Sequence, residues 1–315
     1  MDRIIKFLNI ILTLVLLCLY LSSFFVPYKE FNIITFWISQ FHFLNVSITN
    51  NEVIAAIVGT IFLLLIGISV WLINAKFLNR LENDKLTLLF FFILAIINPI
   101  FIFFTPFHVV TLLLIWGEYL LINKRNFTAM LFFSSMAILY PPAMWILPLC
   151  IFLCMKGSMD KVRDFAKIIS GVILPFIYFF AGDFVITGNF DYCLKHLSPV
   201  ININFLPYNT LDIPTIFLIL IIAFVFFRSI FYYIQNISIN NIIISYIMKV
   251  DIYILLFYSI LFTLFYDAGI NLSIAPFLAI IFSNYFFNNI NKYFPKIELL
   301  VLIVSIVIYR AVWFI

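Results

Sequence analysis

The chain is shaped by residues 86–155, which read LTLLFFFILAIINPIFIFFTPFHVVTLLLIWGEYLLINKRNFTAMLFFSSMAILYPPAMWILPLCIFLCM. This run is almost wholly apolar, but it is interrupted by Asn98-Pro99, Thr105-Pro106, the basic turn 123–126 and Tyr140-Pro141-Pro142. The pieces between these breaks predict helices over residues 86–104, 107–122, 128–140 and 142–155. The third piece has 13 residues. A helix of that length is only about 20 Å long, whereas the hydrocarbon core of a bilayer is roughly 30 Å thick.

Short, broken helices in a long apolar chain have two interpretations. Unpaired backbone groups are costly in lipid, so breaks persist only where protein or a wet cavity covers them. A cavity that opens at membrane depth is one cause of such breaks. The other is a packed core of kinked helices that binds no ligand. The sequence leaves both interpretations open.

The composition of the chain excludes a soluble domain. Of 315 residues, 65% are hydrophobic and 10% are charged, whereas soluble chains have about 25% charged residues. The net charge of +4 does not indicate nucleic-acid binding, because the basic residues are spread over short loops. The four cysteines show neither a disulfide framework nor a metal-binding spacing. We therefore expect no metal and no cofactor.

The apolar segments predict a single transmembrane domain over residues 1–315, all-α and built as a polytopic helical bundle of about eleven spans. The expected spans are residues 7–26, 53–75, 86–104, 107–122, 128–140, 142–155, 168–186, 214–235, 250–266, 272–288 and 297–315. The positive-inside rule orients them with the N-terminus in the cytoplasm and the C-terminus outside. This orientation places 15 of the 18 basic residues inside and leaves Lys29, Lys195 and Arg310 outside. It requires the double proline to split 128–155 into two helices, since one continuous helix would move the basic cluster at 156–167 outside.

Three connecting segments complete the predicted topology. Residues 27–52 form the first outer loop, and its centre, Phe31–Leu44, has the composition of a helix lying in the membrane interface. Residues 187–213 form the longest outer polar loop, and 236–249 an amphipathic connector. We expect the two outer loops to come together over the short helices of 86–155, which would otherwise leave an open depression.

Polar residues that could take part in catalysis or metal binding lie on the predicted outer side. All three histidines fall there, together with six carboxylates: His42, His108, His196, Glu30, Glu52, Asp183, Asp191, Asp212 and Asp267. These residue types suit acid–base or metal chemistry, but no HxxxH, HExxH or paired-carboxylate spacing joins them. For any single one of them the sequence favours a solvated loop residue over a catalytic role, because outer loops need polar residues in any case.

Charges within the helices form a second group. Burying them is costly, so we expect a buried partner for Arg228 and an ion pair between Arg310 and Asp183 or Asp267. Glu118 lies one turn from a helix end, where its side chain is expected to snorkel.

The order of features over residues 86–190 resembles the membrane half of the GT-C glycosyltransferases. The matching features are Asn98-Pro99, Thr105-Pro106, Glu118-Tyr119-Leu120-Leu121 before Asn123-Lys124-Arg125, Tyr140-Pro141-Pro142, Gly171–Pro175 and Thr187-Gly188-Asn189. The resemblance implies a GT-C-like fold that uses a polyprenyl-phosphate-linked sugar as donor. It implies Glu30 as the catalytic base, phosphate contacts from His108 and His196, a charge-offsetting Lys195 and Asp191 as a further substrate-binding residue. The first outer loop departs from the GT-C pattern, because Glu30 is its one carboxylate before Glu52.

The chain is also similar to an uncharacterised family of multi-pass bacterial inner-membrane proteins. The turn Leu139-Tyr140-Pro141-Pro142 and the helix around Ala275–Ala279 carry this similarity, which implies the bacterial cytoplasmic membrane and no particular activity. Two functions remain: an envelope protein that acts on a lipid-linked sugar precursor, and a non-catalytic scaffold that anchors an envelope complex. The expected partners are membrane lipids, a lipid-linked sugar and a further membrane protein, with no nucleic acid.

Overall fold

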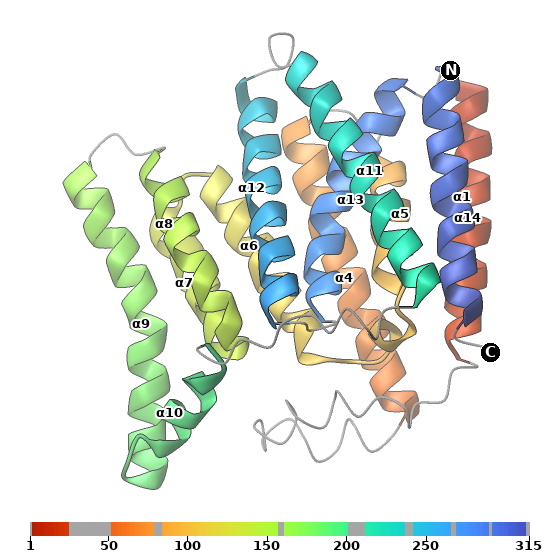
Figure 1. Ribbon diagram of the computed structural model, residues 1–315. Coiled ribbons are helices and arrows are strands. Elements are labelled where there is room, and N and C mark those ends of the chain that lie inside the picture. Colours follow the sequence, from red (N-terminus) through yellow and green to blue (C-terminus); the bar gives the residue numbers. More distant parts are fainter. Residues whose placement is uncertain are drawn as a thin grey trace. The chain divides into compact units, whose positions relative to one another are not determined.

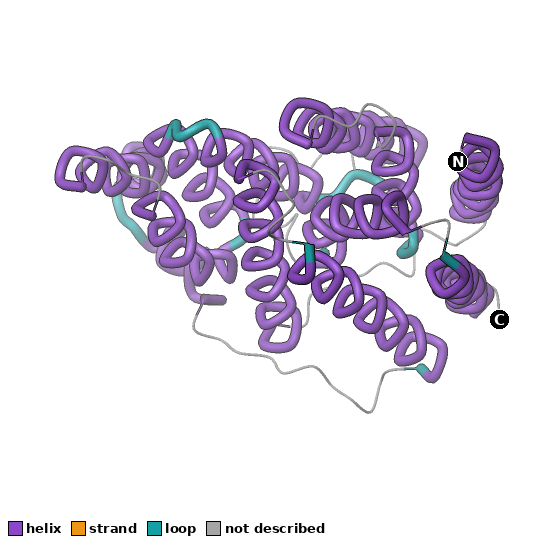
Figure 2. Tube along the Cα trace, turned by 90° about the horizontal axis from the view of Figure 1, so that it is seen from above, coloured by secondary structure: helices purple, strands orange, loops and turns teal. Residues whose placement is uncertain are grey.

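The computed structural model describes residues 2–24, 52–78, 84–156, 161–200, 212–236, 242–265, 269–289 and 292–312. Within these ranges the fold is all-helical, with twelve α-helices, three short 3-10 segments and no strand (Figures 1 and 2). The predicted all-α class is confirmed for this part of the chain. The predicted interfacial helix Phe31–Leu44 and the candidate base Glu30 lie outside the described residues.

The described residues group into two compact units. The first unit takes its residues from Met1–Thr105, Pro207–Ile252 and Ile274–Ile315, and the second from Pro106–Leu206 and Tyr253–Ser273. This grouping does not test whether residues 1–315 form a single transmembrane domain, which stays a prediction.

The helices of the first unit are α1 (Asp2–Ser23), α4 (Glu52–Leu78), α5 (Asp84–Ile96), the 3-10 segment η3 (Pro99–Ile102), α11 (Ile213–Gln235) and α14 (Tyr293–Val312). The second unit holds α6 (Pro106–Ile122), α7 (Asn126–Leu139), η4 (Pro141–Ile146), α8 (Leu147–Lys156), α9 (Lys161–Thr187), α10 (Asp191–Leu197) and η5 (Ser198–Val200). Two helices have residues in both units, α12 (Ile242–Phe265) and α13 (Ile270–Asn289).

Each predicted span corresponds to a helix. One span boundary and two connecting segments differ from the prediction. The helix predicted over 86–104 ends at Ile96, where Asn98-Pro99 begins a separate 3-10 segment. The connector predicted over 236–249 is largely the first part of α12. The helix α10 lies where a polar loop was predicted.

Among the described residues, four helices are long and apolar enough to cross a membrane. Their candidate spans are Val53–Lys76, Val162–Thr187, Ile213–Gln235 and Ile270–Asn289. The remaining apolar helices of the described residues include several short pieces of 10 to 17 residues. The chain therefore has the features of a membrane protein, while the number of spans and their orientation stay predictions.

The break after α5 is covered by protein. The Asn98 side chain caps η3, since its Oδ1 accepts a hydrogen bond from the Ile100 N–H at 3.1 Å, and all four residues of η3 are buried. The Phe104 N–H donates to the Ala55 carbonyl of α4 at 2.9 Å. This close approach requires Gly59, because a Cβ built there would lie 2.3 Å from the Ile102 carbonyl oxygen. In the first unit the break is thus part of a packed core.

The double proline turns the chain back on itself. The Tyr140 carbonyl accepts from the Ala143 N–H at 2.9 Å as η4 begins. At the far end of this hairpin, the Asn126 side-chain amide donates to the Cys154 carbonyl at 3.4 Å. The first turn of α7 therefore lies beside the last turn of α8, and the two helices run in opposite directions (Figure 1). The predicted split of 128–155 into two helices is confirmed.

Arg310 joins the C-terminal ends of three helices of the first unit. Its side chain is buried and donates to the Leu19 carbonyl at 3.2 Å and the Ile97 carbonyl at 3.4 Å. It also contacts the hydroxyl oxygens of Ser22 and Ser23. The last turn of α14 thus lies against the last turn of α1 and the residue that follows α5.

An ion pair between Arg310 and Asp183 or Asp267 was predicted, and the partners that the structure gives Arg310 are carbonyl and hydroxyl oxygens. Asp183 belongs to the second unit and accepts hydrogen bonds from the Cys193 N–H and the Thr187 hydroxyl, so its pairing with Arg310 stays a prediction. Asp267, the other predicted partner, lies outside the described residues. Glu118 is fully buried in α6, so it does not snorkel as predicted.

Candidate functional site

A tight turn places α10 against the end of α9 in the second unit. Gly188 follows the last residue of α9 and has φ +74°, and its N–H donates to the Phe184 carbonyl at 2.9 Å. Glycine at this position is a common helix terminator because it tolerates the left-handed conformation. The Asp183 carboxylate then accepts from the Cys193 N–H at 2.9 Å and the Thr187 hydroxyl at 3.1 Å. One buried carboxylate therefore fixes the start of α10 on α9.

His196 attaches α10 to α7. Its side chain is buried, and Nε2 lies 2.6 Å from the Ile138 carbonyl oxygen. A carbonyl only accepts, so Nε2 carries the hydrogen. Burial lowers the pKa of His196, an effect that the Ile138 hydrogen bond partly opposes. The imidazole is thus a neutral donor at pH 7, stacked against Tyr192 at 6.1 Å between ring centroids.

The segment 187–200 covers the double-proline end of the α7–α8 hairpin. Besides the His196 bond, the Trp145 indole N–H of η4 donates to the Val200 carbonyl at 3.2 Å. This is the position predicted for the second outer loop. Most of the first outer loop, residues 27–51, lies outside the described residues, so its convergence with this segment stays a prediction.

The structure brings some of the predicted site residues together. Asp191 and Lys195 are exposed on α10, beside the buried His196 of the same helix. His108 lies in the first turn of α6 and is fully buried. Both histidines are thus packed side chains here, and a phosphate contact from either stays a prediction that requires it to become accessible.

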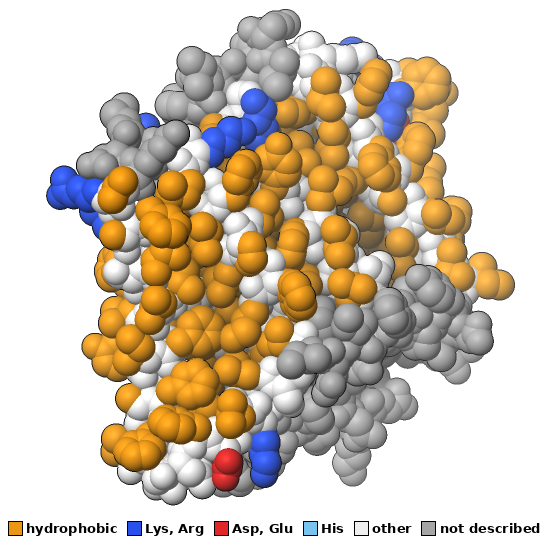
Figure 3. Space-filling model, turned by 60° about the vertical axis from the view of Figure 1, so that its left-hand side comes forward, with side chains coloured by type: hydrophobic (Ala, Val, Ile, Leu, Met, Phe, Trp, Pro, Cys, Tyr) orange, Lys and Arg blue, Asp and Glu red, His pale blue; other side chains and the backbone are white. Residues whose placement is uncertain are grey.

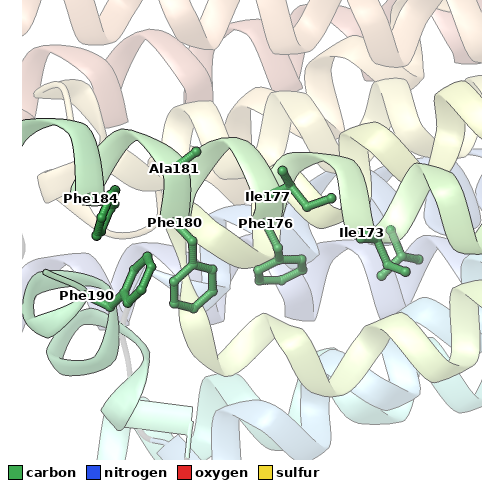
Figure 4. A pocket seen from close by; sticks show the side chains of 8 residues that line it. Ile173, Phe176, Ile177, Phe180, Ala181, Phe184 and Phe190 are labelled. Carbon is green, nitrogen blue, oxygen red and sulfur yellow. The ribbon is translucent and has the colours of Figure 1, made fainter. Parts of the chain in front are cut away.

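The second feature of this region is an apolar groove along α9. It has a volume of about 460 Å³ and is lined by Val172, Ile173, Phe176, Ile177, Phe180, Ala181, Phe184 and Phe190. The Phe176, Phe180 and Phe184 rings project from one side of α9, and Phe190 turns back towards them from the start of α10 (Figure 4). The Phe190 ring stacks on Phe184 at 5.3 Å and meets Phe180 edge-on at 6.0 Å.

The groove lies on an exposed, apolar face of α9. The candidate span Val162–Thr187 is only 17% buried within the protein, and the face that brings α9 forward is covered by hydrophobic side chains (Figure 3). Sequence reasoning missed this groove, although the spacing of Phe176, Phe180 and Phe184 by four residues gives them a common helix face. An apolar lining of this kind suits an acyl or isoprenoid chain.

Metal or thiol chemistry finds no support in the region. Among the described residues, no group of three His, Cys, Asp or Glu side chains is arranged to hold a metal ion. Burial, together with the neighbouring Asp183 carboxylate, raises the pKa of Cys193 to about 12. A thiol with that pKa is protonated at neutral pH and is a poor nucleophile.

The fold and the groove define the class of protein. It is all-helical, has helices that can span a membrane, and carries a groove lined by apolar side chains on one of these helices, α9. No protein family, curated protein or solved structure matches the chain in comparisons. The GT-C resemblance and the similarity to the inner-membrane family therefore remain predictions from the sequence.

Proposed function

We propose that the protein is a multi-pass envelope protein that holds a lipid-linked molecule in the second unit. The observation that carries the proposal is the apolar groove on α9, which ends at the turn into α10. The hydrocarbon chain would lie along Phe176, Phe180 and Phe184. The polar head would lie near the exposed Lys195, whose charge offsets that of a phosphate. A polyprenyl-phosphate-linked sugar is the occupant that the GT-C resemblance implies.

We further propose eleven alternating spans with the N-terminus inside. In this order α1, α5 and α14 are spans one, three and eleven, so their C-terminal ends must lie on one side, and Arg310 contacts all three ends. Spans four and ten, α6 and α13, must likewise begin on one side. The Thr111 hydroxyl of α6 lies 3.0 Å from the Ser273 hydroxyl, near the start of each helix. These contacts support the alternation.

The antiparallel α7–α8 hairpin makes one part of the topology robust. A hairpin returns to the side from which it started, whether it crosses the bilayer or only enters it. We therefore expect reporters fused after Lys124 and after Lys161 to be cytoplasmic, and one fused at Asn204 to be external. Alkaline phosphatase and green fluorescent protein fusions measure this in cells. Opposite sides for Lys124 and Lys161, or one side for Lys161 and Asn204, would contradict the topology.

The groove is tested by filling it. Ala181→Trp places an indole among the lining residues, so we expect labelling by a photoactivatable polyprenyl phosphate to fall about tenfold, which corresponds to about 1.4 kcal/mol of binding free energy. The matched control is Val185→Trp, since Val185 is 83% exposed on α9 and does not line the groove. Equal labelling of the wild type and Ala181→Trp would contradict the proposal.

The same assay separates the two candidate functions. Transfer of a sugar requires a general base, for which the resemblance offers Glu30, and it would convert a sugar-bearing probe to product. A scaffold would retain the probe unchanged. The scaffold is the second candidate because both His108 and His196 are buried in packing positions.

A further inference from the structure

A charged cluster lies between α11, α13 and α14 in the first unit. The Arg228 Nε lies 3.1 Å from Glu298 Oε1. The other carboxylate oxygen accepts from the Tyr285 hydroxyl at 2.5 Å. The Glu298 side chain is only 8% exposed, so the buried partner predicted for Arg228 is confirmed. Both oxygens of the carboxylate are thus engaged: Oε1 holds the guanidinium of Arg228, and Oε2 is held by Tyr285.

The cluster extends to a second cation. Tyr232 lies one turn after Arg228 on α11, and its ring meets that of Tyr285 edge-on at 5.9 Å. The Lys292 ammonium, just before α14, lies 5.8 Å from the centre of the Tyr232 ring, within cation–π range. Lys296 is exposed one turn further along. The cluster thus holds the paired Arg228 and a second cation, Lys292, that is not paired with Glu298 in the structure.

The position of this cluster is unusual for a structural ion pair. Arg228 lies within the candidate span Ile213–Gln235, yet 46% of its side chain is exposed. Just beside Lys292, Tyr293 and Phe294 are 76% and 69% exposed. In the proposed topology, on which this step rests, α14 is the eleventh span, and an exposed tyrosine at the end of a membrane helix is typical of the headgroup level of a bilayer. An exposed cation at that depth meets lipid headgroups.

We propose that Arg228 and Lys292, with Lys296 at the rim, bind the phosphate group of an anionic phospholipid. A guanidinium held by Glu298 presents its outer N–H donors in the planar arrangement that matches phosphate oxygens. Lys292 supplies a second charge, positioned by the Tyr232 ring. Basic pockets between membrane helices bind anionic headgroups on the cytoplasmic side, which is the side that the positive-inside rule assigns to these residues.

The proposal predicts a lipid-specific stabilisation. We would measure the melting temperature of the full-length protein in neutral detergent against increasing phosphatidylglycerol or phosphatidylcholine. We expect phosphatidylglycerol to raise it at lower concentration than phosphatidylcholine. Lys292→Gln should weaken the apparent phosphatidylglycerol affinity about fivefold, because one basic side chain near the headgroups is removed. Lys292→Gln leaves the Arg228–Glu298 pair in place, so the variant is expected to fold.

Controls separate this site from general charge effects. Lys167→Gln removes an exposed lysine of α9 that pairs with Asp164 at 3.4 Å, and it should leave the phosphatidylglycerol affinity unchanged. Arg228→Gln together with Lys292→Gln should abolish the preference for phosphatidylglycerol. An equal response to both lipids, wild-type affinity in Lys292→Gln, or the same stabilisation by inorganic phosphate would overturn the lipid site.

Discussion

Replacing Arg310 by alanine is expected to lower the free energy of unfolding by about 3 kcal/mol or more, since it removes charge-assisted hydrogen bonds and leaves a cavity. Arg310 is 4% exposed and donates to carbonyls at the ends of α1 and α5. The last carbonyls of a helix have no partner within the helix, and a cation near them also interacts favourably with the helix dipole. The residue thus stabilises three helix ends with one side chain.

The measurement is thermal or denaturant unfolding of the protein in one detergent. Arg125→Ala is the control, because Arg125 is exposed and its side chain makes no capping hydrogen bond to α7; such surface changes usually stay within about 0.5 kcal/mol. Arg310→Met tests the role of the charge, since methionine fills much of the same space. A methionine variant more stable than the wild type would show that the buried cation is a net cost.

The helical class and most helix positions were predictable from the sequence, because proline residues lie at the breaks between the apolar segments. Pro99, Pro106 and Pro142 interrupt the hydrogen bonding of a continuous helix, whereas the orientation inferred from the basic turns stays a prediction. The end of α5 was misplaced because Ile100–Phe104 is as apolar as a helix. The close packing of the Ile102–Phe104 backbone against α4 depends on Gly59, which is distant in sequence.

The candidate site was less predictable, for physical reasons. A histidine in a polar loop has the same sequence context whether it binds phosphate or, like His196, a main-chain carbonyl. The partners of Arg310 are carbonyls and serines up to 291 residues away, which no charge pattern reveals. In the α9 groove, the phenylalanines that face lipid are the same residue type as those that pack the core. Composition cannot separate these roles, and the three-dimensional contacts do.

Gly59→Ala should destabilise the protein by about 3 kcal/mol or more, at or above the upper end for overpacked cores. The new Cβ would lie 2.3 Å from the Ile102 carbonyl oxygen and 2.6 Å from the Phe104 nitrogen. These are backbone atoms, and the Phe104 N–H is itself bonded to Ala55 on the same helix as Gly59. No side-chain rotation relieves such a clash, so α4 and the segment after α5 must separate.

Gly182→Ala is the matched control on α9, another candidate membrane span. A Cβ at Gly182 would meet nothing within 4 Å, so the change should be neutral or stabilise α9 by up to about 1 kcal/mol through the higher helix propensity of alanine. Unfolding of both variants in one detergent gives the comparison. If Gly59→Ala were as stable as Gly182→Ala, the segment 99–104 would not be pressed against α4. The break at Asn98-Pro99 would then border open space, and a cavity in the first unit would replace the packed core.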